Sequence, residues 1–124
     1  MANQILITAG SISLKATLNE TDTAHSIFEA LPIEGNVNRW GDEIYFSIPV
    51  QLSEAEDARQ DMEIGELGYW PVGKAFCIFF GRTPVSQGQN PRAYSNVNPF
   101  GKIEGDATRF QEVTDNESIR ITKV

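Results

Sequence analysis

Aromatic and basic side chains gather in the second half of this chain, where a long stretch lacks acidic residues. Between Lys74 and Ile103 the sequence contains no Asp or Glu, whereas Arg82 and Arg92 contribute positive charge. Guanidinium groups bind carboxylates and phosphates through paired hydrogen bonds, and aromatic walls with a few polar groups are typical of ligand pockets. We therefore expect a binding module for a short peptide or a small anionic ligand, with these ligand-binding residues: Trp40, Tyr69, Trp70, Phe76, Arg82, Arg92, Tyr94 and Asn96.

Each of these residues also has a structural interpretation. The aromatic side chains, Phe76 above all, could fill the core of a β-barrel, and the two arginines could pair with acids of the first half. Tyr94 and Asn96 could supply hydrogen bonds at the mouth of the site, but Asn is also an ordinary turn residue. The sequence leaves both interpretations open.

Two carboxylates are candidates for acid/base chemistry, which needs acids that converge in a dry cleft. Glu43 and Glu66 each lie beside an expected strand, although acids on alternating strands usually face water. His25, the one histidine, falls on an expected helix and is read as an exposed residue there. The sequence has no Cys/His cluster, calcium loop, phosphate loop or serine-nucleophile motif, so we expect no metal and no cofactor.

Composition predicts one acidic domain in a reducing compartment. The 124 residues carry a formal net charge of -7, which argues against nucleic-acid binding. The single cysteine, Cys77, lies in an apolar run, so a buried reduced thiol is expected. No leader pattern is visible, and no apolar stretch reaches the ~18 residues of a membrane span. We expect a cytoplasmic protein with no membrane contact.

The first half of the chain reads as a hairpin, a helix and a turned pair of strands. Apolar and polar residues alternate on both sides of Ala9-Gly10-Ser11, which predicts a β-hairpin. Thr21 or Asp22 can cap a helix that Pro32 ends. A strand signal at 33–37, a break at 38–42 and alternation at 44–48 follow, then an exposed acidic loop over 51–60 with at most one helical turn.

The second half reads as further short strands around one strand that is apolar on both faces. That strand, 75–80, follows a turn at 71–73 and must be covered on both sides. A long polar loop is expected over 82–99, overlapping a bent strand or strand pair at 95–98 and 100–103, and then a closing hairpin over 110–121. With eight or more short strands and one clear helix, the pattern predicts an all-β barrel or sandwich.

Three segments carry a family resemblance. They are Trp40-Gly41-Asp42-Glu43-Ile44-Tyr45-Phe46, then Gly68-Tyr69-Trp70-Pro71 with Gly73-Lys74-Ala75-Phe76-Cys77-Ile78-Phe79-Phe80-Gly81-Arg82-Thr83-Pro84, and Asn98-Pro99-Phe100-Gly101-Lys102-Ile103. In this order and spacing they resemble a family of small archaeal and bacterial proteins of undetermined function with a cyclophilin-like β-barrel. The resemblance implies a mainly all-β single domain over residues 1–124, built as a closed eight-stranded antiparallel barrel with one or two short helices.

The resemblance does not extend to the site of the prolyl isomerases. True cyclophilins carry a Phe-His-Arg and a Gln-Gly-Gly-Asp motif, and neither occurs here. An isomerase-like or carboxylate-dependent enzyme with a non-standard site therefore remains an alternative to the binding module. A homo-oligomeric assembly protein is a third.

Overall fold

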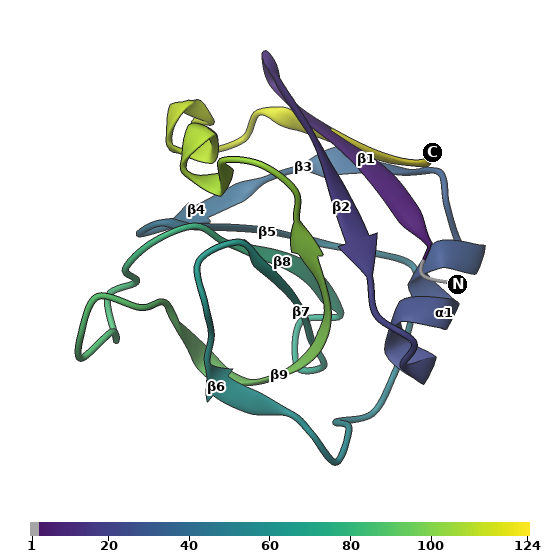
Figure 1. Cartoon of the computed structure of the whole chain (residues 1–124), viewed down its shortest axis with the longest axis horizontal. Coiled ribbons are helices and arrows are strands. Elements are labelled where there is room, and N and C mark those ends of the chain that lie inside the picture. Colours follow the sequence, from purple (N-terminus) through teal and green to yellow (C-terminus); the bar gives the residue numbers. More distant parts are fainter. Residues whose placement is uncertain (1–2) are drawn as a thin grey trace.

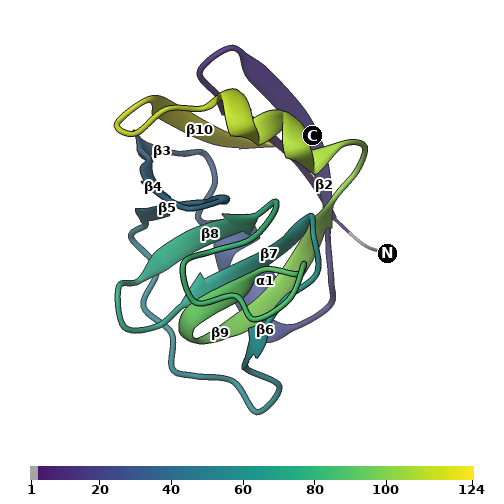
Figure 2. The ribbon, with the colours of Figure 1, turned by 90° about the vertical axis from the view of Figure 1, so that its left-hand side faces the viewer.

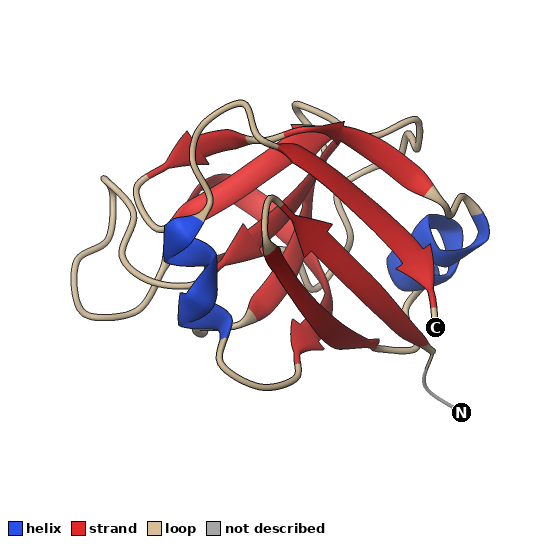
Figure 3. Cartoon of the chain, turned by 90° about the horizontal axis from the view of Figure 1, so that it is seen from above, coloured by secondary structure: helices blue, strands red, loops and turns tan. Residues whose placement is uncertain are grey.

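The computed structural model describes residues 3–124, which form ten strands, one α-helix and one 3-10 helix (Figure 1). The bounds are β1 Gln4–Ala9, β2 Ile12–Leu18, α1 Asp22–Glu29, β3 Ile33–Asn36, β4 Asn38–Trp40, β5 Glu43–Ser47, β6 Arg59–Asp61, β7 Glu66–Trp70, β8 Ala75–Phe79, β9 Arg92–Ile103, η1 Ala107–Glu112 and β10 Ser118–Lys123. The two helical segments lie on opposite sides of the strands (Figure 3). Among the described residues, no helix has the length and apolar character to cross a bilayer.

The strands form one rolled antiparallel sheet in the order β3-β10-β1-β2-β9-β7-β8-β5-β4, with β6 added beside β9. The two edge strands, β3 and β4, follow each other in the chain and meet at Val37. No ladder within residues 3–124 joins them. Val37 instead exchanges backbone hydrogen bonds with the turn before β10, from its N–H to Glu117 O at 2.9 Å and from Asn116 N to its carbonyl at 2.8 Å. The mainly-β antiparallel prediction is confirmed, but the described residues form ten strands rather than eight, and no hydrogen-bonded ladder among them closes the roll.

Strand β8 is buried on both faces, as its sequence predicted. Phe76 and Ile78 enter the main core inside the roll. Ala75, Cys77 and Phe79 point the other way, into a second apolar cluster completed by Met62, Ala93 and Val97. The sheet formed by β7, β8 and β5 therefore separates two apolar layers.

The second layer exists because β9 bends across the outer face of the sheet. Its first half pairs with β6 and its second half with β7 and β2, and it appears as a long green arc in Figures 1 and 2. The β7–β9 register shifts between Leu67 and Gly68, which is how a bulge redirects a strand. A Cβ at Gly68 would lie 2.6 Å from a methyl of Val97, so the close approach of β9 requires glycine there.

Helix α1 begins where the capping pattern placed it. The hydroxyl of Thr21 accepts a hydrogen bond from Ala24 N at 3.2 Å, which satisfies one of the free N–H groups of the first turn. Ala24 and Ile27 face the core, and His25 is exposed as expected.

The segment 51–58 is a loop without a helix, as expected, and the bent strand is the alternative that the structure shows for 95–103. Two other expectations differ from the structure, the first being that the polar loop after β8 ends before Arg92, where β9 begins, and not at residue 99. Pro99 fits inside that strand because it lies at the register shift opposite Gly68. The closing hairpin over 110–121 is wrong in its first arm: residues 107–112 form η1, capped by Asp106, whose Ala107 and Phe110 share one face at i, i+3 spacing and pack into the core.

Candidate functional site

A pocket of about 250 Å³ lies in the second layer, between the outer face of the β5–β8–β7 sheet and the start of β9. Hairpin register decides which side chains enter it, because residues directly opposite each other on paired strands share a face. Trp40 is opposite Glu43 across the Gly41-Asp42 turn, and Tyr45 is opposite Cys77. The pocket is lined by Trp40, Glu43, Tyr45, Trp70, Cys77, Ala93, Tyr94 and Val97.

Four aromatic rings form its walls, each turned steeply against the next. The ring centroids of Trp40 and Tyr94 are 6.1 Å apart at an interplanar angle of 73°, and those of Tyr94 and Trp70 are 6.1 Å apart at 77°. Trp70 and Tyr45 follow at 6.2 Å and 81°. Trp70 Nε1 donates to Ser95 Oγ at 2.7 Å, which fixes the indole. Tyr94 is 69% exposed, so it stands at the mouth of the pocket.

Glu43 is the one acidic side chain that lines this pocket, and it is almost fully buried. Only 5% of the residue is exposed, and its Oε1 has no hydrogen-bond partner. Burial raises the pKa of Glu43 to about 8, against a smaller opposing effect of the Cys77 thiol. A carboxyl with such a pKa is mostly protonated at neutral pH. It either donates a hydrogen bond to a ligand or becomes a carboxylate when a ligand provides a partner.

The thiol and phenol beside Glu43 stay neutral. Burial, followed by the charge of Glu43, raises the pKa of Cys77 well above its ordinary value, so the thiolate needed for nucleophilic chemistry does not form readily. Burial and the Glu43 charge also raise the pKa of Tyr45. Cys77 is thus a buried free thiol, in the core role that its sequence context predicted.

The structure brings together three of the eight expected ligand-binding residues. Trp40, Trp70 and Tyr94 line the pocket, together with the candidate acid Glu43. Tyr69 and Phe76 point to the other face of the sheet from the pocket and lie fully buried in the main core. The hydroxyl of Tyr69 donates to Val50 O at 2.6 Å and accepts from Leu52 N at 3.1 Å, so it anchors the loop after β5.

The remaining three expected residues do not line this pocket. Arg82 is exposed, and its contact is with the carbonyl of Ser86 at 3.4 Å in its own loop. The Nε of Arg92 lies 3.6 Å from a carboxylate oxygen of Asp61, and its Nη2 lies 3.3 Å from the amide oxygen of Gln60. Asn96 donates to Glu54 at 3.4 Å. The pairing of Arg92 with an acid of the first half matches the structural interpretation of that residue.

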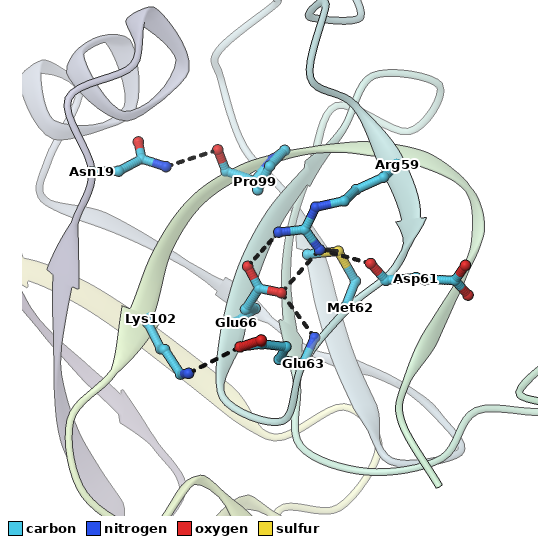
Figure 4. A network of polar contacts seen from close by, with 8 residues as sticks. All are labelled: Asn19, Arg59, Asp61, Met62, Glu63, Glu66, Pro99 and Lys102. Carbon is cyan, nitrogen blue, oxygen red and sulfur yellow. Dashed lines mark hydrogen bonds and ion pairs between the residues drawn. The ribbon is translucent and has the colours of Figure 1, made fainter. Parts of the chain in front are cut away.

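Glu66, the second candidate acid, is held in an ion pair outside the pocket (Figure 4). Arg59 donates to both of its oxygens, at 2.9 and 2.6 Å, and Glu63 N donates at 2.8 Å. Burial alone would raise the pKa of Glu66, but the hydrogen bonds from Arg59 and Glu63 outweigh it and lower the pKa. Glu66 is therefore an ionised structural partner, whereas Glu43 lines the pocket and has one buried oxygen without a hydrogen-bond partner.

Four lining residues were not among the site residues expected from the sequence: Tyr45, Cys77, Ala93 and Val97. The hairpin register was the available signal for Tyr45. A two-residue turn at Gly41-Asp42 pairs Trp40 with Glu43, and strand alternation then puts Tyr45 on the same face. Ala93 and Val97 had no such signal, because the bend of β9 brings them over the sheet. Residues 3–124 contain no group of three or more His, Cys, Asp or Glu side chains arranged to hold a metal ion.

Comparison with known proteins places this architecture in one family. The cyclophilin-like family model matches residues 3–122. The solution structure of the hypothetical protein AF2241 from Archaeoglobus fulgidus is 35% identical, with a TM-score of 0.84, over 99% of this chain and 95% of that chain. Among curated proteins, no significant match is found. The chain therefore belongs to the cyclophilin-like family, within a group of small proteins that includes this archaeal one.

Proposed function

We propose that the protein is a binding module whose pocket takes a small ligand, or one side chain of a short peptide, through a single polar contact with Glu43. The observation that carries this proposal is the unpartnered oxygen of Glu43, a residue that is only 5% exposed and lines an aromatic cavity. Leaving such a group unsatisfied costs roughly 1–3 kcal/mol in a folded protein. A ligand that bonds to it removes that penalty.

The size and composition of the cavity support a small ligand. Drug-sized ligand pockets measure roughly 300–1,000 Å³, and this one, at about 250 Å³, lies just below that range. Its walls are mainly aromatic and aliphatic, with the carboxyl as a directional group. Because Tyr94 stands exposed at the mouth, the rest of a peptide could extend outside.

The sequence favoured a short peptide or a small anionic ligand, and the side chains that line the pocket argue against the anion. Arg82 and Arg92 do not line it, and Arg92 already has partners. An anion would lie beside Glu43 with no basic side chain among the lining residues. We therefore propose a binding module for a short peptide or for a small ligand that donates a hydrogen bond to the carboxyl of Glu43, in place of an anionic ligand.

Intrinsic fluorescence gives a direct assay. The chain has two tryptophans, Trp40 and Trp70, and both line the pocket, so occupancy should change the emission. We expect saturable changes with at least some members of a fragment set that spans cationic, neutral and anionic compounds. The variant Ala93→Leu, which fills the cavity, should abolish them, whereas the exposed variant Val72→Ala should not. A set that leaves both emission and melting temperature unchanged would refute the binding module.

A carboxyl-dependent enzyme is the second candidate, favoured by the raised pKa of Glu43. A general acid or base works best when its pKa is near the working pH. Among the lining residues Glu43 has no acidic partner, so one group would have to serve both directions of proton transfer. A protease-coupled proline isomerisation assay tests the isomerase form, and a rate equal to the uncatalysed one for wild type and Glu43→Gln alike would exclude it.

A further inference from the structure

We infer that the ligand of this pocket carries an organic ammonium group, enclosed by the four aromatic rings with Glu43 as its counter-ion. The inference rests on the proposed function and specifies its ligand class. Three observations carry it: the ring geometry, the lack of positive charge around the carboxyl, and the burial of that carboxyl.

The four aromatic rings follow one another along the wall of the pocket. Each successive pair among Trp40, Tyr94, Trp70 and Tyr45 is inclined by 73° to 81°, with centroids 6.1 to 6.2 Å apart. Because all four rings line the same pocket, a cation inside it can approach more than one of them. Ring faces attract ammonium groups when the cation lies within about 6 Å of the centroid, and tryptophan does so most strongly. Both tryptophans of the chain line this pocket.

The electrostatics favour a cation over the other charge states. The pocket that Glu43 lines has no Lys, Arg or His in its wall; besides Glu43 itself, its titratable lining residues are Tyr45 from β5, Cys77 from β8 and Tyr94 from β9. A neutral donor would bond to the carboxyl but would gain little from the ring faces. An anion would be repelled by the rings and by any charge on Glu43. An ammonium group is attracted both by the ring faces and by the carboxylate of Glu43.

Binding must then release a proton. Burial holds the pKa of Glu43 at about 8 in the empty pocket, so at pH 7 the carboxyl carries a proton. An arriving cation stabilises the carboxylate, and the proton leaves to solvent. Affinity for a cation should therefore rise by up to tenfold per pH unit below about pH 8 and level off above it. Because their pKa values are raised, Cys77 and Tyr45 remain neutral over this range.

A matched pair of probes separates charge from shape. Choline and 3,3-dimethylbutan-1-ol have nearly the same shape, with a quaternary nitrogen in one and a carbon in the other, and neither titrates near neutral pH. At pH 8.5 we expect choline to bind wild type about tenfold or more tightly than the alcohol, measured by tryptophan emission and calorimetry. Benzylammonium, benzyl alcohol and benzoate extend the comparison to a group that can donate hydrogen bonds.

Two variants test the named roles. Glu43→Gln keeps the shape of the side chain and should weaken choline binding about tenfold, while it should change the affinity for the alcohol by less than about threefold. Tyr94→Leu removes one exposed ring with little effect on folding and should also weaken choline selectively. Calorimetry in buffers of different ionisation enthalpy should show close to one proton released per choline at pH 7 for wild type, and none for Glu43→Gln.

The outcomes distinguish this inference from the function it rests on. If the alcohol or benzoate binds wild type as well as the matching cation, or if no proton is released, the ammonium inference is wrong while the binding module stands. If cationic, neutral and anionic probes all fail to bind, both are wrong.

Discussion

Replacing Glu43 by glutamine should make the protein more resistant to alkaline conditions. Glu43 is 5% exposed as a residue, one of its carboxyl oxygens has no hydrogen-bond partner, and its folded-state pKa is about 8 against an ordinary value of 4.5. Between these two values the folded chain holds a proton at this site that the unfolded chain has lost. The free energy of unfolding therefore falls as pH rises through that window. Glutamine has the same shape, stays neutral, and removes this dependence.

The magnitude follows from the size of the shift. Each pKa unit corresponds to 1.36 kcal/mol, so a rise from 4.5 to about 8 corresponds to about 5 kcal/mol of stability lost by pH 9. Water entering the pocket would solvate the carboxylate, so this figure is a ceiling. Even half of it would be large beside the 5–15 kcal/mol that typically holds a small domain together.

Urea unfolding of wild type and Glu43→Gln at pH 5, 6.5, 8 and 9 measures the effect. The stability difference in favour of the variant should grow steadily to pH 8 and then level off, with equal slopes against urea. Glu112→Gln, at an exposed position, serves as a control and should show no such growth. A difference between wild type and Glu43→Gln that stays constant across the four pH values would refute the assignment of a buried neutral carboxyl.

Two further predictions concern side chains that hold the fold around the pocket. Arg39 donates to Gly41 O at 2.6 Å, Gln111 O at 3.1 Å and Val113 O at 2.8 Å, so Arg39→Ala should lower the free energy of unfolding by about 2–4 kcal/mol in urea; a loss within 0.5 kcal/mol would contradict this role. Asn98 is 1% exposed and binds Ala55 N at 2.8 Å and Ser53 O at 3.0 Å, so Asn98→Ala should cost about 2–3 kcal/mol and expose the 51–58 loop to proteases. Its exposed neighbour provides the control, since Asn96→Ala should change stability by less than about 0.5 kcal/mol.

Most strands could be read from the sequence because strand periodicity is a local property. Alternation identified the first hairpin, and the continuous apolar run of β8 required cover on both faces, which the structure provides. The strand predicted around Phe110 was wrong, because two apolar residues three positions apart fit a 3-10 turn as well as an irregular strand. The difference between those two lies in the contact of Phe110 with the core, which no local pattern records.

The residues of the candidate site could be predicted only in part, because their positions also depend on tertiary contacts that no local pattern records. Trp70 and Tyr69 are adjacent and both aromatic, so the sequence predicted both as ligand-binding residues. Register decides between them: Trp70 shares a face with Ala75 and the pocket, whereas Tyr69 faces the opposite core. The basic residues Arg82 and Arg92 drew attention to positive charge, yet the pocket is lined by the carboxyl of Glu43 on β5.

The sequence by itself determined the antiparallel strands, the capped helix, the doubly buried β8 and the aromatic residues available for a site, since each depends on neighbours within a few positions. Only the tertiary structure decided that a pocket exists and what charge it holds. The bulge at Leu67 and Gly68 lets β9 cross the sheet, and this crossing removes Glu43 from water. A carboxyl that would be an ordinary surface anion on an open strand thereby becomes a neutral buried group, because its ionisation depends on the solvent around it and not on its identity.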